Sequence, residues 1–194
     1  MRTTHSVAWL IVCGGVLALA VASLSIEASS AGMVPARTGG FGEMTCAECH
    51  SGNPPNDAAG RLTLDGVPEA YAPGERYTVR VTLRRPGLVR GGVQLTAREG
   101  GINMSAGADA GWLSPADERM ETVQGERGVT YLQQTRSGTR AQEPGAATWT
   151  FTWTAPEAER PVAFHVAAIA SDADGSPSGD VLYTLESRTR AESP

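Results

Sequence analysis

Apolar and polar residues alternate with a period of two over most of the chain after residue 60, a pattern that is typical of β-strands. The clearest run is ATWTFTWTAP, residues 147–156, in which Trp149, Phe151 and Trp153 alternate with threonines. The run YTVRVTL, residues 77–83, follows the same pattern. We expect one face of each strand to lie in a core and the other to face water.

Other runs of this kind follow along the chain. Five are expected to be strands: RLTLDGV (61–67), GVQLTAR (92–98), GVTYLQQT (128–135), VAFHVAAI (162–169) and DVLYTLES (180–187). Glycine, proline and aspartate concentrate between the runs, which indicates tight turns. Residues 101–126 lack a clear period and are expected to form a long surface excursion. Short strands joined in this way predict an all-β chain, folded as an antiparallel sandwich over residues 61–190.

The chain begins with an apolar run that is typical of an export signal. Arg2 precedes the run, and Ser29 and Ala31 supply the small residues that a signal peptidase prefers. We therefore predict a signal peptide over residues 1–31 and a periplasmic, extracellular or cell-surface location. Residues 7–26 could just span a bilayer, so we expect membrane attachment only if this segment is retained.

The charge pattern argues against nucleic acid as a partner. The chain has 16 basic and 21 acidic residues, a formal net charge of -5, and every basic residue is an arginine. The arginines are scattered among acidic residues and form no basic stripe that could follow a phosphate backbone. We predict no nucleic-acid binding.

Residues 32–60 differ in composition from the chain on either side. They are rich in glycine and proline and carry too few apolar residues to form a core of their own. Something else must order this loop segment, and its two cysteines are the evident candidates.

Cys46, Cys49 and His50 form a Cys-x-x-Cys-His run, which is the attachment motif of c-type haem. Thiols at this spacing can bond to the two vinyl groups of a porphyrin, and the histidine that follows can ligate the iron. We predict Cys46 and Cys49 as covalent haem-attachment residues and His50 as the proximal iron ligand. A Cys46–Cys49 disulfide would leave His50 unexplained. A zinc site would need a fourth ligand, either His165 or a carboxylate.

Several short motifs occur in an order that resembles the bacterial reeler-like proteins, exported β-sandwich domains headed by one Cys-x-x-Cys-His motif. The matching pieces are CAECHSG, YAPGERYTVRVTL, GGVQLTARE, ATWTFTWTAP and DGSPSGDVLYT, spread over residues 39–184. The resemblance implies an immunoglobulin-like sandwich with the haem motif at its N-terminal edge. It says little about a reaction.

His165 is one candidate for the second axial ligand of a haem iron. It lies on an expected strand between Ala163 and Ala167, which could leave room for a flat ring against the sheet. The alternative is an ordinary half-exposed strand residue, and a vacant axial position is also open. The other candidates are Met44, Met104, Met120, Gln133 and Gln134, of which a methionine would raise the reduction potential relative to a second histidine.

The turn SDADGSPSGD raises the question of calcium. Asp172, Asp174 and Asp180 resemble the opening of a calcium loop, but the bidentate glutamate that completes such a loop is missing. A hairpin connection built on Asp-Gly chemistry is the alternative.

Together these features predict an exported mono-haem c-type protein that transfers single electrons or senses a small ligand at the haem. Its redox partner or surface ligand is not identified by the sequence. The alternative is a cell-surface or extracellular adhesion module in which the Cys-x-x-Cys-His segment is structural. No paired nucleophile and base and no phosphate-binding loop are evident in the sequence, so an enzyme is the less favoured interpretation.

Overall fold

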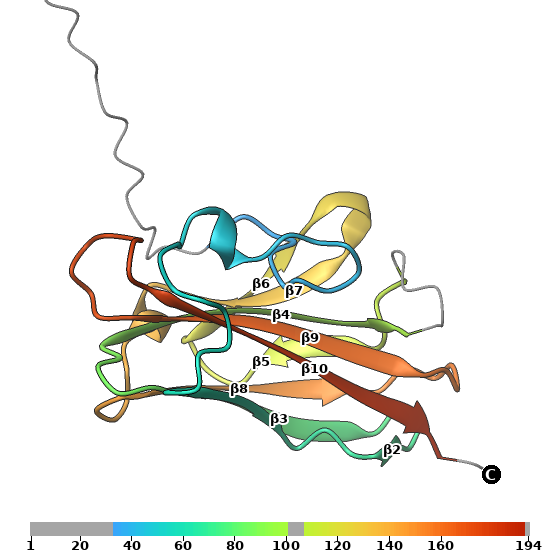
Figure 1. Cartoon of the computed structure of the whole chain (residues 1–194). Helices are drawn as coiled ribbons and strands as arrows, with labels where there is room; N and C mark the ends of the chain where they lie inside the picture. The colour runs from blue at the N-terminus through green and yellow to red at the C-terminus, as the bar shows by residue number, and fades with distance from the viewer. Residues whose placement is uncertain (1–32, 101–106, 193–194) are drawn as a thin grey trace, which may run out of the picture.

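Two β-sheets packed face to face form the body of the protein (Figure 1). The computed structural model describes residues 33–100 and 107–192. The smaller sheet has the order β1-β3-β8-β5 and consists of β1 (Arg61–Asp65), β3 (Arg76–Arg84), β8 (Ala146–Thr154) and β5 (Trp112–Pro115). The larger sheet has the order β2-β10-β9-β4-β7-β6 and consists of β2 (Ala70–Tyr71), β10 (Val181–Ala191), β9 (Val162–Ser171), β4 (Arg90–Glu99), β7 (Thr130–Gln134) and β6 (Met120–Gln124).

Neighbouring strands are antiparallel, except that the short β2 pairs in parallel with the end of β10. Short 3-10 turns lie outside the strands: η1 (Cys46–Glu48) precedes β1, whereas η2 (Glu126–Gly128) and η3 (Ser137–Thr139) lie in connections between strands. The expected all-β sandwich is therefore confirmed, with one parallel pair in addition. Across residues 33–100 and 107–192 we find no helix with the length and hydropathy needed to cross a bilayer. The expected signal peptide lies outside the described residues.

The alternating aromatic residues of β8 form the centre of the core between the two sheets. Trp149, Phe151 and Trp153 are almost completely buried, while the threonines between them are half-buried on the outer face. Trp153 makes edge-to-face contacts with Tyr71 and Phe164, at centroid distances of 5.4 and 5.0 Å. Its indole nitrogen donates a hydrogen bond to a backbone carbonyl at 2.9 Å, so the buried ring leaves no polar atom unsatisfied.

The expected surface excursion over residues 101–126 contains two strands, and that expectation was wrong for the described part. β5 is an edge strand of the smaller sheet and pairs with β8, and β6 pairs with β7 along its whole length. β5 is only four residues long, ends at a proline and exposes Trp112. β6 carries several polar residues, so neither strand gives a clear period in the sequence.

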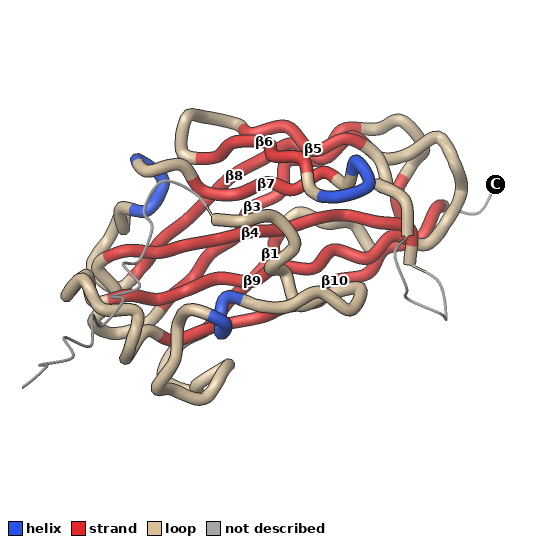
Figure 2. Tube along the Cα trace, turned by 90° about the horizontal axis from the view of Figure 1, so that it is seen from above, coloured by secondary structure: helices blue, strands red, loops and turns tan. Residues whose placement is uncertain are grey.

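The loop segment, residues 33–60 as far as it is described, lies over the outer face of the larger sheet (Figures 1 and 2). As a result β9 is buried on both faces, and only its last residue is partly exposed. Phe164 and Val166 belong to the core between the sheets, whereas Ala167 and Ile169 pack beneath the segment in a small second cluster. The outer face of β9 is therefore covered by chain that precedes the sandwich.

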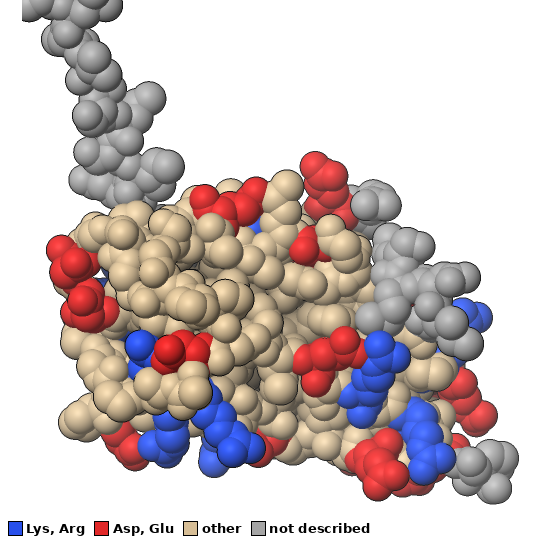
Figure 3. Space-filling model, in the orientation of Figure 1, with Lys and Arg blue, Asp and Glu red and all other residues tan. Residues whose placement is uncertain are grey.

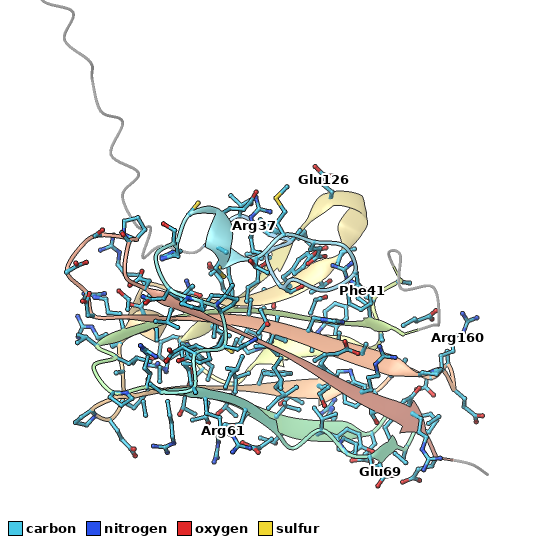
Figure 4. All side chains as sticks on the ribbon, in the orientation of Figure 1. Arg37, Phe41, Arg61, Glu69, Glu126 and Arg160 are labelled. Carbon is cyan, nitrogen blue, oxygen red and sulfur yellow. The ribbon has the colours of Figure 1, made fainter. Side chains whose placement is uncertain are left out.

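Polar side chains hold the loop segment on the sheet. Arg98 of β4 and Glu43 of the segment form an ion pair with little exposure of either side chain, and both groups contact the hydroxyl of Tyr131. The guanidinium of Arg98 also lies 4.6 Å from the ring centre of Phe41. Phe41 is labelled in Figure 4. The backbone NH of Arg37 donates to the buried Gln94 side chain at 2.7 Å. These contacts order a segment that lacks an apolar core of its own.

The charged side chains on the face shown in Figure 3 are mixed in sign. Ion pairs also join segments that are distant in the sequence, such as Arg85 with Asp57 at 2.5 Å and Arg160 with Glu99 at 2.9 Å. The hydrogen bond from Arg85 holds the pKa of the Asp57 carboxyl below its ordinary value.

Candidate functional site

The turn η1 brings Cys46, Cys49 and His50 together. Thr45 caps the turn, because its hydroxyl oxygen accepts a hydrogen bond from the backbone NH of Ala47 at 3.3 Å. The NH groups of Cys49 and His50 both donate to the carbonyl of Cys46, at 3.2 and 2.9 Å. The three predicted haem residues therefore lie on one short hydrogen-bonded turn.

The two thiols of this turn have different surroundings, and both are free. Cys46 is 6% exposed and packs in the small cluster with Ala167, Ile169 and Leu182, whereas Cys49 is exposed. Burial raises the pKa of the Cys46 thiol to about 12. At neutral pH Cys46 is therefore a protonated thiol, and a thiol of this kind is a poor nucleophile in its own right.

His50 is paired with a buried carboxylate from the other end of the chain. Its Nδ1 lies 2.6 Å from Oδ2 of Asp180, whose side chain is only 2% exposed. An ionised carboxylate can only accept hydrogen bonds, so Nδ1 must be the donor. In the neutral imidazole this leaves the lone pair on Nε2, which is the form that ligates metals.

The loop that carries Asp180 is hydrogen-bonded to the loop segment. The NH of Ser51 donates to the carbonyl of Pro177 at 3.2 Å, and the NH of Gly179 donates back to the carbonyl of Ser51 at 2.9 Å. The side chain of Asn53 donates to the carbonyl of Gly179 at 2.5 Å. Gly179 has a φ of +99°, a conformation that disfavours residues with a side chain. These bonds fix the direction from which Asp180 approaches the imidazole.

A cavity of about 370 Å³ lies beside the turn and is lined by Cys46, Cys49, His50 and Asp180. This volume falls within the usual range of small-molecule sites, about 300 to 1,000 Å³. Apolar side chains and three arginines also line the cavity: Met33, Val34, Ile169, Arg37, Arg90 and Arg136. Glu48 lies on the same wall. Because Cys49 is exposed, the cavity reaches the surface.

The three arginines differ in their engagement. Arg37 forms an ion pair with Glu48 at 2.8 Å. Arg90 donates a hydrogen bond to the hydroxyl of Thr139 at 3.0 Å. The exposed Arg136 has no ion-pair partner within the described part of the chain. A cationic group at the rim of the cavity is therefore available to a negatively charged substituent of a ligand.

His165 lies away from this cavity. It is 8% exposed and packs against Phe41, at a ring-centre distance of 4.7 Å, under Gly40. Its Nε2 is buried and has no hydrogen-bond partner among residues 33–100 and 107–192, and a carboxylate oxygen of Glu186 is 3.8 Å away. The structure therefore does not bring His165 together with His50. His165 is also buried, so it is not the half-exposed strand residue given as the alternative.

The other candidates for the second axial ligand also lie at separate places. Met44 is exposed on the loop segment, Met120 is buried in the core, and Met104 lies outside the described residues. Gln134 lines the cavity, but its side-chain oxygen accepts a hydrogen bond from the NH of Val93 at 2.7 Å. The methionine in the cavity wall is Met33, which the sequence interpretation did not consider.

The three aspartates that resemble the opening of a calcium loop do not converge. Asp172 and Asp174 accept hydrogen bonds from backbone NH groups two residues further on, at 3.1 and 2.7 Å, while Asp180 contacts His50. Among residues 33–100 and 107–192, no group of three or more histidine, cysteine or acidic side chains is arranged to hold a metal ion. The loop joins the antiparallel strands β9 and β10, so the hairpin connection given as the alternative is confirmed, and Asp180 contacts His50 from this loop.

Comparison with known proteins gives similarity of architecture only. No family model matches the chain, and no curated protein sequence matches it. The reeler domain of human F-spondin is 21% identical, with a TM-score of 0.49, over 73% of this chain and 95% of that domain. A structure of the Reelin-N domain of F-spondin is 19% identical, with a TM-score of 0.48, over 76% of this chain and 95% of that one. A cohesin module from a Clostridium perfringens family 33 glycoside hydrolase is 10% identical, with a TM-score of 0.44, over 69% of this chain and 98% of that module.

None of these similarities reaches a TM-score of 0.5. The assignment of the fold therefore rests on the two sheets themselves, and no activity is transferred from these proteins.

Proposed function

We propose that this chain is an exported binding module and that the ligand of its Cys46–His50 turn is a covalently attached haem. The observation that carries the proposal is the position of both thiols and the imidazole on the wall of one cavity, with Asp180 on Nδ1 of the imidazole. That bond leaves Nε2 as the atom that can ligate iron.

The residues around the cavity fit such a group. Cys46 and Cys49 would each add their S–H across one vinyl group, and His50 would ligate the iron through Nε2. Ile169 and Met33 offer apolar surface, and Arg136 at the rim offers a partner for a propionate. When bound, the haem would supply one-electron chemistry or a binding position for a small ligand.

The low exposure of Cys46 bears on how attachment would occur. Its thiol lies against the apolar cluster beside the cavity, and its raised pKa keeps it protonated. Addition of an S–H across a vinyl group conserves that proton, but a buried thiol is hard for an assembly enzyme to reach. Attachment is therefore expected before this part of the chain has closed.

One observation favours a second candidate, a binding or adhesion module in which the turn is structural. The loop segment is held by the Arg98–Glu43 ion pair and by hydrogen bonds to the loop before β10, contacts that require no cofactor. Under this alternative, Cys46 serves only as a small buried apolar residue. The surface ligand would then be bound elsewhere on the sandwich.

A single expression experiment separates the two candidates. The full chain is produced in a bacterial periplasm with and without the c-type haem assembly machinery, beside a Cys46→Ala/Cys49→Ala variant. Covalent haem predicts a coloured protein that keeps its haem through denaturing electrophoresis and acid-acetone extraction, only with the machinery and only with both cysteines. A folded, colourless protein under all conditions would reject the haem and leave the structural module.

A further inference from the structure

The carboxylate of Asp180 is the most deeply buried acidic group in contact with the proposed haem turn. Its side chain is 2% exposed, and its only ion-pair contact within the described residues is with Nδ1 of His50. A buried carboxylate needs a hydrogen-bond donor or a charge partner, because burial in a medium of low polarity is costly otherwise. The structure provides that partner in the imidazole, which belongs to a segment 130 residues earlier.

From this contact we infer that Asp180 is a positioning residue for His50 that makes its Nε2 a stronger electron donor toward a bound metal. The inference rests on the proposed function, since it concerns the iron of the haem. A histidine ligand whose other nitrogen donates to a carboxylate becomes more basic than one that donates to a neutral group. A more basic ligand stabilises the oxidised metal, so the contact sets a low reduction potential.

The position of Asp180 does not depend on the imidazole alone. The loop on which it lies is tied to Ser51 by two backbone hydrogen bonds and to Asn53 by a side-chain bond. The backbone carbonyl of Asp180 also accepts a bond from Asn53 at 3.4 Å. The carboxylate is therefore presented to His50 by a fixed backbone, which is what an orienting contact requires.

The charge of the carboxylate, rather than its shape, is the property to test. Asp180→Asn keeps an oxygen that can accept the Nδ1 proton but removes the negative charge. Asp174→Asn is the matched control, because it removes the same charge from the same loop at an exposed residue, whose carboxylate accepts a hydrogen bond from the backbone NH of Ser176. In haem-loaded protein, the midpoint potential should shift upward in Asp180→Asn and stay at the wild-type value in Asp174→Asn.

A second measurement needs no haem. The ¹⁵N shifts of His50 in the wild-type apoprotein, recorded in alkaline buffer where imidazoles are neutral, report which nitrogen carries the proton. The inference predicts the Nδ1–H tautomer. Since this measurement uses the wild-type chain, it does not depend on whether a variant folds.

The two measurements separate the inference from the proposed function. Colourless protein with His50 in the Nδ1–H tautomer would reject the haem and keep the orienting contact. The Nε2–H tautomer would overturn the contact, whether or not haem is present. Equal potentials in wild type and Asp180→Asn would overturn the effect of the carboxylate on the metal.

Discussion

The two faces of β9 are buried by different kinds of chemistry. On the inner face, Phe164 and Val166 pack against the aromatic residues of β8 in a core that the strand pattern already specifies. On the outer face, Ala167 and Ile169 lie under a loop segment that is fastened by an ion pair and hydrogen bonds. The difference shows that the sandwich and the candidate site depend on separate sets of contacts, although they share one strand.

The largest expected effect comes from the inner face. Trp153→Ala removes a fully buried indole that touches three other aromatic rings, and we expect it to lower the free energy of unfolding by about 3–5 kcal/mol. Urea denaturation followed by far-UV circular dichroism measures this. Trp112→Ala is the matched control, because Trp112 is 71% exposed and its loss should change stability by no more than about 0.5 kcal/mol. Similar decreases in the free energy of unfolding in both variants would show that the aromatic core is not the dominant contribution to stability.

Removal of the whole loop segment, which covers the outer face of β9, should have the next largest effect on stability. A chain that begins at Ala59 keeps all ten strands, so it should still unfold cooperatively, but with a Tm lower by roughly 10 °C than the chain that begins at Gly32. The uncovered outer face of β9 should also bind a hydrophobic dye. Calorimetry and dye fluorescence test both points, and loss of cooperative unfolding would show that the segment and the sandwich form one core.

A single contact of the cover should matter less than the cover itself. Glu43→Ala leaves Arg98 buried without its carboxylate partner, a loss that the segment can relieve by lifting from the sheet. We expect the free energy of global unfolding to fall by about 1–2 kcal/mol and amide hydrogens in residues 33–50 to exchange faster. The amides of β3 and β8 should remain protected from exchange. Glu126→Ala, at the exposed tip of the β6–β7 hairpin (Figure 4), is the control and should leave the exchange pattern unchanged. Uniformly faster exchange after Glu43→Ala would argue against a separable cover.

The smallest effect concerns pH. Burial lowers the pKa of His165, and Arg188 and Arg98 act in the same direction, while Glu186 and Glu43 oppose it. Below about pH 6.5 the unfolded chain therefore binds a proton at this histidine that the folded chain does not. The free energy of unfolding consequently decreases as the pH is lowered, until the folded pKa is reached. His165→Leu should flatten this part of the profile of unfolding free energy against pH, measured by urea denaturation. A parallel profile in wild type and variant would show that His165 does not contribute to the acid sensitivity.

The inner core could be predicted from the sequence because its information is local. Alternation in β3, β8 and β9 identifies the strands, and the aromatic stripe of β8 identifies the buried face. β5 and β6 were missed, since four or five residues with polar members do not establish a period. Local alternation also cannot report that a distant loop covers the other face of a strand, which is why His165 is more buried than the sequence suggested.

The candidate site was predictable in part. Spacing alone identified Cys46, Cys49 and His50 as one group, and the structure places them on one cavity wall. The contact between His50 and Asp180 joins residues 130 positions apart, and no local pattern encodes it. Met33 was missed for a similar reason, because a lone methionine beside the expected cleavage point carries no signal until the cavity is known.

For a chain exported as we propose, the separation between His50 and Asp180 also sets an order of events during translocation. The turn with both thiols would cross the membrane first, whereas the strands beneath it and the loop that carries Asp180 lie more than a hundred residues later in the chain. Until β9 and β10 arrive, Cys46 has no apolar wall against which to pack, and its thiol is as accessible as that of Cys49. Non-local sheets of this kind close slowly. An attachment enzyme would therefore have its opportunity during this interval, and completion of the last strand would end it.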